Sequence, residues 1–205
     1  MTKPALLRVF ATILMTILLG ACASTSKPVG EWRDQGFNRQ LNNFLVIGVT
    51  SRSTRRRSFE DLFVAQLAIA DVRAIPSYKL IESSMHLTRD IVERAIEGQN
   101  LGAVLVTRLV GIKDEAVYKL PANYDDDRGY MGYYDHAWQE TSTGYYSQYQ
   151  VFTLETTLYD TVSGKLVWSM QSEAIEASQP RHIVEAQIAL TIEMLAKQGL
   201  IAVKP

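Results

Sequence analysis

The chain has 205 residues, of which 47% are hydrophobic and 21% charged, a composition typical of one globular domain with accessory segments. Its net charge is −1, and removing the two basic residues near the start, Lys3 and Arg8, would leave −3, which gives no electrostatic basis for binding nucleic acid. Only one cysteine is present, Cys22, so an internal disulfide and a cysteine-based metal site are excluded.

Residues 1–21 have the pattern of a signal peptide that is removed on export. Lys3 and Arg8 precede an uncharged run from Val9 to Leu19, which is shorter than the roughly 20 residues needed to span a bilayer. The run ends in LLGAC at residues 18–22, which resembles the bacterial lipobox. We therefore expect cleavage between Ala21 and Cys22, and lipid attachment to Cys22; an ordinary secretory signal is the alternative.

A lipidated Cys22 decides where the protein resides. Several fatty-acyl chains, such as palmitate, give stable membrane anchoring, and an acylated cysteine has no free thiol for catalysis. The next residue is Ala23 rather than the aspartate that retains enterobacterial lipoproteins in the inner membrane. The sequence thus predicts a lipid-anchored protein on the inner leaflet of the outer membrane, facing the periplasm.

Residues 22–42 are interpreted as the lipidated N-terminus and a tether. The stretch from Ala23 contains Pro28 and Gly30 and shows no periodicity. Residues 31–42 include Trp32 and Phe37, and we expect this part to lie against the domain. The domain itself is assigned to residues 43–203.

The first half of the domain predicts alternating strands and helices. An apolar run at 43–50 predicts a buried strand, and apolar residues at helical spacing over 59–70 predict a helix that ends before Pro76. Residues 77–82 read as a second strand. Thr88 is a candidate N-cap for a helix that stops at Gly98, and 103–112 form a third strand. Such an order implies right-handed crossovers and a partly parallel sheet.

The second half predicts a hairpin and a terminal helix. Residues 149–160 and 165–175 alternate between apolar and polar, with a turn at 161–164 in which Gly164 supplies a positive φ. Pro180 suits the start of a helix and Gly199 its end. The predicted class is α/β (α+β): one mixed five-stranded sheet, βαβαβ followed by a β-hairpin and a C-terminal helix. Residues 113–148 show no core pattern and are interpreted as an inserted tyrosine-rich loop.

These segments, in this order and spacing, resemble a family of uncharacterised proteobacterial outer-membrane lipoproteins. The resemblance is carried by WRD at 32–34, FLVIGV at 44–49, RR at 56–57, FED at 59–61, PSY at 76–78, GAVLVT at 102–107, LYD at 158–160 and SGKLVWS at 163–169. More remotely, the layout is similar to the curli secretion-channel subunit, to lipoprotein activators of penicillin-binding proteins and to the N-terminal domain of the Tol protein. The resemblance implies an envelope assembly or adaptor role rather than catalysis.

Four arginines near the start of the first helix form a candidate anion site: Arg52, Arg55, Arg56 and Arg57. An anion could bind between these cations and the free backbone N–H groups of a helix N-terminus. The alternative is that Glu60 and Asp61, one helical turn later, pair with Arg56 and Arg57.

A second candidate surface is the tyrosine-rich stretch, since residues 118–149 hold eight of the ten tyrosines. Tyrosine and tryptophan offer large contact areas at low entropic cost, which favours a partner-binding or glycan-binding surface. The alternative is a long hairpin whose tyrosines cover the sheet. The possible partner-binding residues are Tyr124, Tyr130, Tyr133, Tyr134, Trp138, Tyr145 and Tyr146.

No pattern for catalysis, a metal or a cofactor was found. The three histidines, His86, His136 and His182, are far apart, and the acids at 125–127 lack the spacing of a calcium loop. We expect no enzymatic activity, no cofactor and no metal. The sequence predicts a non-catalytic adaptor or assembly factor that binds an envelope protein or peptidoglycan. The alternatives are a small-anion or glycan-binding lipoprotein and an envelope hydrolase.

Overall fold

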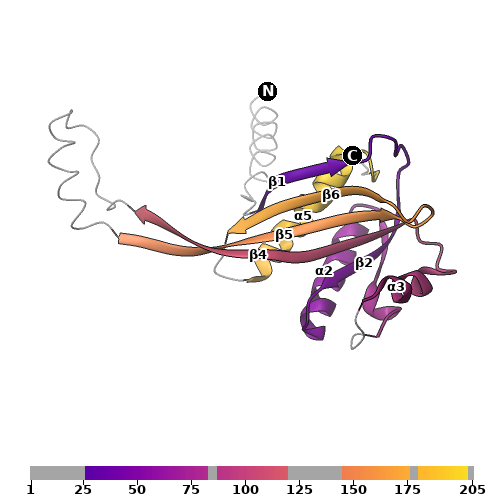
Figure 1. Cartoon of the computed structure of the whole chain (residues 1–205), viewed down its shortest axis with the longest axis horizontal. Helices are drawn as coiled ribbons and strands as arrows, with labels where there is room; N and C mark the ends of the chain where they lie inside the picture. Colours follow the sequence, from indigo (N-terminus) through magenta and orange to yellow (C-terminus); the bar gives the residue numbers. More distant parts are fainter. Residues whose placement is uncertain (1–25, 83–86, 120–144, 176–179, 203–205) are drawn as a thin grey trace, which may run out of the picture.

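A computed structural model describes residues 26–82, 87–119, 145–175 and 180–202. Its centre is one mixed sheet with the strand order β1-β6-β5-β4-β2-β3. The helices α2 (Ser53–Ile69) and α5 (Pro180–Lys197) cover one face, and the shorter α3 (Arg89–Ile96) covers the other face over β2 and β4 (Figure 1). The mixed α and β class is confirmed, although the sheet has six strands rather than five.

The additional strand is β1 (Ser26–Arg33), which lies within the segment predicted to be a tether. It pairs antiparallel with β6 (Leu166–Ile175) along one edge of the sheet, with a register shift between Pro28 and Gly30. Proline is tolerated on an edge strand because its missing N–H can face away from the ladder. The tether prediction for 22–42 is therefore wrong over this stretch.

The first crossover runs from β2 (Asn43–Val49) through α2 to β3 (Arg73–Pro76). The helix ends where Asp71 takes a φ of 61° and the N–H of Val72 bonds to the carbonyl of Leu67, a Schellman arrangement without glycine. Directly after this turn the chain pairs with β2, from Arg73 to Pro76. The predicted strand at 77–82 is wrong, and a 3-10 turn begins at Ser77 instead.

The strands β4 (Ala103–Lys119) and β5 (Tyr145–Asp160) are longer than predicted. Ala103 to Arg108 lie parallel to β2, and β4 then continues with β5 as its antiparallel neighbour up to the pair Lys119 and Tyr145. Residues 113–119 and 145–148 are consequently strand, not loop, and this part of the inserted-loop prediction is wrong. The rest of it, 120–144, lies outside the described residues.

The C-terminal predictions hold in detail. Gly164 has a φ of 68° in the turn between β5 and β6. At the end of α5, Gly199 has a φ of 67°. The N–H of Gly199 donates to the carbonyl of Ala196, and the N–H of Leu200 donates to the carbonyl of Leu195. These two bonds are the Schellman pair, and both leucines are buried.

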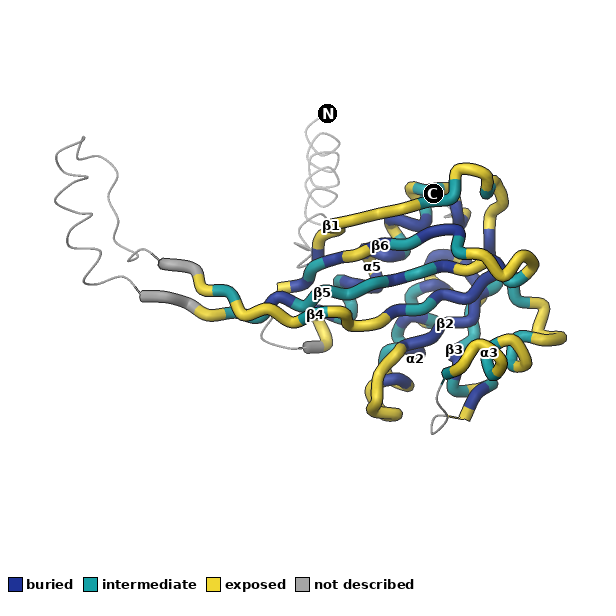
Figure 2. Tube along the Cα trace, viewed as in Figure 1, coloured by how far each residue is buried: buried dark blue, intermediate teal, exposed yellow. Residues whose placement is uncertain are grey.

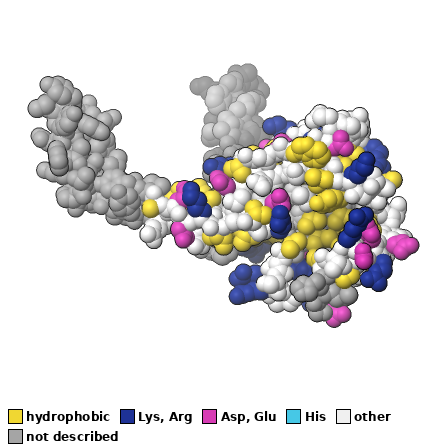
Figure 3. All heavy atoms as spheres, in the orientation of Figure 1, with side chains coloured by type: hydrophobic (Ala, Val, Ile, Leu, Met, Phe, Trp, Pro, Cys, Tyr) yellow, Lys and Arg dark blue, Asp and Glu magenta, His cyan; other side chains and the backbone are white. Residues whose placement is uncertain are grey.

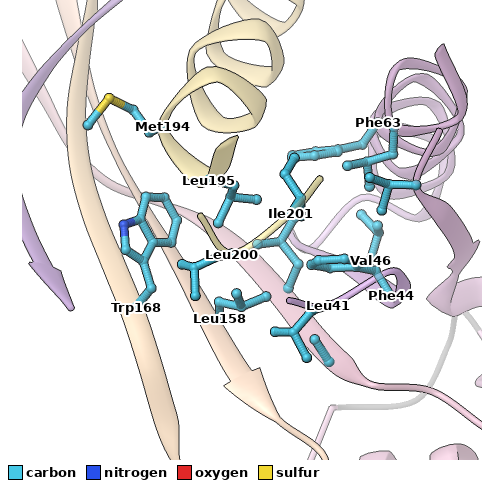
Figure 4. Packing of buried hydrophobic residues seen from close by; sticks show 14 of the residues in the cluster. Leu41, Phe44, Val46, Phe63, Leu158, Trp168, Met194, Leu195, Leu200 and Ile201 are labelled. Atoms are coloured by element: carbon cyan, nitrogen blue, oxygen red, sulfur yellow. The ribbon is translucent and has the colours of Figure 1, made fainter. Parts of the chain in front are cut away.

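The main core lies between the sheet and the two long helices (Figure 2). Its largest buried side chain is Trp168 of β6, which faces Met194 and Leu195 of α5 (Figure 4). A smaller cluster on the other face joins Leu45 and Ile47 of β2 to the apolar side of α3. Since α3 is short, it covers only the β2 and β4 part of that face.

Candidate functional site

The most distinctive feature of the molecule is a two-stranded extension of the sheet, which we call the ribbon: Asp114–Lys119 of β4 and Tyr145–Gln150 of β5. In the described residues β2 ends opposite Arg108, and β6 pairs with β5 only from Val151 onward. The ribbon strands are therefore paired with each other alone, and they project beyond the helices (Figure 1). Two-stranded ribbons are marginally stable in isolation.

Polar contacts hold the base of the ribbon together. The hydroxyl of Tyr149 donates to Oε2 of Glu115 at 2.9 Å, and Nζ of Lys113 lies 2.8 Å from Oε1 of the same carboxylate. Hydrogen bonds from Lys113 and then Tyr149 hold the pKa of Glu115 below its usual value. The hydrogen bond to Glu115 raises the pKa of both Lys113 and Tyr149. At neutral pH the ribbon base thus carries a carboxylate between a cation and a phenol.

Beside the ribbon base lies an apolar patch, which we define as Leu109, Ile112, Phe152 and Leu154. Leu109 pairs with Leu154 and Ile112 with Phe152 on either side of a β-bulge in β4. Leu109 is 49% exposed and Ile112 56%, and their partners are half-buried. Exposed apolar side chains grouped in this way indicate a contact surface.

Of the predicted partner-binding residues, the structure describes two. Tyr145 and Tyr146 stand at the start of β5, opposite Lys119 and Tyr118, at the far end of the ribbon. The others, Tyr124, Tyr130, Tyr133, Tyr134 and Trp138, lie outside the described residues, as do Ala21 and Cys22.

The four arginines of the predicted anion site are not brought together. Arg56 is buried and forms an ion pair with Glu60, Nε to Oε1 3.0 Å, so the pairing alternative describes this residue. Arg57 lies over the ring of Tyr78, whose hydroxyl donates to Asp61. Arg52 and Arg55 are exposed. Arg56 is therefore turned away from any anion that the others could bind.

Sequence reasoning missed the network around this ion pair. The hydroxyl of Ser77 donates to Oε1 of Glu60 at 2.5 Å and accepts from Nη2 of Arg56 at 2.6 Å. Backbone N–H groups of Gly48 and Tyr78 donate to the same carboxylate, at 3.0 and 3.1 Å. All hydrogen-bonding groups of a buried pair must be satisfied for it to be tolerated. The network ties β2, α2 and the turn after β3 together, which is a structural role.

Among the described residues, no helix covers β1, β5 and β6 on the face of the sheet opposite α2 and α5, and hydrophobic side chains gather on this face between charged ones (Figure 3). Trp32 of β1 lies beside Ser169 and is half exposed, at 49%. The expectation that residues 31–42 lie against the domain is confirmed for the strand backbone, and the indole itself remains accessible.

The described residues contain no group of three or more histidine, cysteine, aspartate or glutamate side chains placed to hold a metal ion. Within the same residues, no helix has both the length and the apolar character needed to cross a membrane. His182 is exposed, and the other two histidines lie outside the described residues.

No family model matches the chain, and no curated protein does. Among solved structures, a PelC dodecamer from Paraburkholderia phytofirmans carrying one substitution is similar over 81% of this chain and 96% of its own, with 15% identity and a TM-score of 0.45. A lipoprotein from Neisseria meningitidis is similar over 76% of this chain and 99% of its own, with 14% identity and a TM-score of 0.40. A minor lipoprotein from Acinetobacter baumannii is similar over 80% of this chain and 98% of its own, with 6% identity and a TM-score of 0.30.

Proposed function

We propose that this protein is a cell-envelope lipoprotein, anchored through Cys22, that acts as a non-catalytic adaptor and captures an envelope partner with the ribbon and the tyrosine-rich segment at its end. The anchor is supported by the LLGAC motif directly after a short apolar run. The alanine that follows Cys22 supports the outer membrane as its location. The partner is an envelope protein or peptidoglycan.

The observation that carries the adaptor role is the ribbon. Residues 120–144 leave the sheet at Lys119 and return to it at Tyr145, so they begin and end at the tip of an extension that no other described strand accompanies. A connection of this length is usually functional when it is not disordered, and disorder normally goes with few aromatic residues. Tyrosine and tryptophan side chains suit recognition of another surface.

The partner is expected to be neutral or basic. Between residues 113 and 149 the acidic side chains (Asp114, Glu115, Asp125, Asp126, Asp127, Asp135 and Glu140) outnumber the basic ones (Lys113, Lys119 and Arg128). Such a surface repels anionic lipopolysaccharide and attracts cationic groups.

Small-anion binding is the second candidate. It retains support only from Arg52 and Arg55, which are exposed near the N-terminus of α2. An envelope hydrolase is the least supported alternative, because it needs a positioned acid and base or an activated nucleophile.

The adaptor role is tested by crosslinking and pull-down from intact envelopes. One variant replaces Tyr124, Tyr130, Tyr133 and Tyr134 with serine. Its matched control replaces Asp125, Asp126 and Asp127 with asparagine, in the same segment. We expect the tyrosine variant to lose the captured partner and to keep the melting temperature of the wild type, while the control keeps both. Unchanged capture would contradict the proposal, and a large fall in melting temperature would show that the tyrosines cover the sheet.

A further inference from the structure

The anchor and the sheet are separated by very little chain. Only Ala23, Ser24 and Thr25 lie between Cys22 and the first residue of β1, Ser26. Four residue steps span at most about 14 Å even when fully extended. If the acyl chains on Cys22 are in the bilayer, Ser26 is held close to its surface, and the domain cannot turn freely as it could on a long tether.

We propose that the end of the sheet at which β1 begins faces the lipid bilayer, and that the apolar patch at this end contacts the membrane surface directly. This inference rests on the lipid anchor of the proposed function. It adds which surface of the domain meets the lipid, and hence where the ribbon is held.

The strand register connects the anchor to the patch. Ser26 lies opposite Ala174 of β6, Ala174 opposite Phe152 of β5, and Phe152 opposite Ile112 of β4. These residues form one row across four neighbouring strands. Strands lie about 4.8 Å apart, so Ile112 is about 14 Å from Ser26. The patch is thus about as far from Ser26 as Cys22 can reach.

The patch belongs to the helix-covered face but is not covered by the helices. Leu158 lies in the main core beneath α2 and α5, and side chains alternate along β5, so Leu154 and Phe152 point to that same face. Among the described residues, the exposed fractions of Leu109 and Ile112 show that the cover ends before them. An apolar group left open beside a membrane anchor is suited to the bilayer interface, where burial of apolar area strengthens attachment.

Two exposed basic side chains also lie at this end of the sheet. Since β2 is parallel to β4 and ends opposite Arg108, α2 begins at the end of the sheet from which the ribbon leaves. Arg52 and Arg55 are exposed there, and neither forms an ion pair within the part of the chain that the structure describes. Basic side chains near an anionic bilayer surface are attracted to it.

The opposite end of the sheet provides an internal reference. The turn between β5 and β6 includes Val162, which is exposed. Eight residue steps along β5 separate Phe152 from Asp160, where that turn begins, and they span about 27 Å. The proposal therefore predicts a large difference in lipid proximity between the two ends.

The experiment uses the lipidated full chain in vesicles of phosphatidylethanolamine and phosphatidylglycerol with a quencher attached to the lipid headgroups. Because Cys22 is the only cysteine and is acylated, an introduced cysteine is the only free thiol. A fluorophore is placed at Ala116→Cys, an exposed ribbon position, or at Val162→Cys in the turn. We expect strong quenching at 116 and little at 162. Equal quenching, or stronger quenching at 162, would overturn the proposed orientation.

A second pair of variants tests whether the patch itself contacts the bilayer or whether the short linker alone holds residue 116 near it. A flexible Gly-Ser insert of about 20 residues between Thr25 and Ser26 frees the domain to turn. Quenching at 116 should persist in this chain and be largely lost when Leu109→Ser and Ile112→Ser are added. Loss of quenching on insertion alone would overturn direct contact by the patch. Co-flotation of the protein with the vesicles reports the lipid anchor separately, so failure of the anchor is not confused with failure of the orientation.

Discussion

The indole N–H of Trp168 donates a hydrogen bond to Oε1 of Glu31, 2.8 Å away on the neighbouring strand. One end of this side chain therefore fixes the edge strand β1, while its ring is fully buried against α5. We expect Trp168→Ala to lower the free energy of unfolding by about 3–5 kcal/mol, as aromatic truncations in cores do. Glu31→Ala, which removes only the acceptor, should cost about 0.5–1.5 kcal/mol. Denaturant unfolding measures both, and similar values for the two variants would contradict this account.

The ion pair between Arg56 and Glu60 leads to a contrast between adjacent arginines. Arg56→Leu leaves the Glu60 carboxylate buried without its cation and should cost about 3–5 kcal/mol. Arg55→Leu, at the exposed neighbouring position, should stay within about 0.5 kcal/mol of the wild type. Thermal unfolding of the two variants is the measurement, and equal melting temperatures would show that the buried network adds nothing to stability.

Gly48 is tested by adding a single methyl group. A Cβ at this position would lie 2.8 Å from Cδ1 of Phe59, so Gly48→Ala should cost about 1–3 kcal/mol through overpacking. Gly30→Ala is the matched control because a Cβ there meets nothing within 4 Å. Adding Phe59→Leu to Gly48→Ala should recover part of the loss. If it recovers none, the cost arises elsewhere than at the ring.

Asp160 predicts a dependence of stability on pH. Burial raises the pKa of this carboxyl, but hydrogen bonds from the hydroxyl and N–H of Ser163, together with the cation of Arg39, outweigh burial and leave the pKa below its usual value. A carboxyl whose pKa is lowered by folding stabilises the fold at pH values above its unfolded-state pKa of about 3.9. This stabilisation is lost as the pH falls through the folded-state pKa. The free energy of unfolding of the wild type should therefore exceed that of Asp160→Asn by a constant amount from about pH 6 to about pH 4, and this difference should shrink below about pH 4. An advantage that grew on acidification would contradict the assignment.

Lipidation is the simplest prediction to check. In Cys22→Ser we expect no incorporation of labelled fatty acid and accumulation of the unprocessed precursor, because the thiol is the attachment point. Mass spectrometry of the wild-type protein should give a mature N-terminus at an acylated Cys22. A mature N-terminus at any other residue would remove the basis of the anchor.

The parts of the fold that were predicted correctly are those with a strong local signal. The continuous apolar run of β2, the turn at Gly164 and the end of α5 at Gly199 each depend on residues close in sequence. In contrast, β1 contains Pro28 and Gly30 and has mostly exposed side chains, so only its pairing with β6 makes it a strand. The strand β3 was placed too late, at 77–82, because α2 ends with a positive φ at Asp71 and not at a glycine that would mark its end.

The candidate site was predicted only in part, because only some of its features leave a local signal in the sequence. Its tyrosines are visible in the composition, but the ribbon strands have polar residues on both faces, and period-two hydrophobicity does not reveal such strands. Likewise, the spacing of Arg56 and Glu60 allowed their pairing, whereas Ser77 joins them only through the crossover to β3. Contacts made across the sheet leave no local pattern.

The edge position of β1 also constrains the order in which the chain can fold. Among the described strands its only neighbour is β6, so β1 has no partner until residues 166–175 have been synthesised. Contacts between such distant residues must close a long loop before they yield any stabilisation, which slows folding. If the lipid anchor proposed at Cys22 is correct, β1 therefore stays unpaired next to that anchor until β6 has been delivered, and it joins the sheet only when the rest of the domain is present.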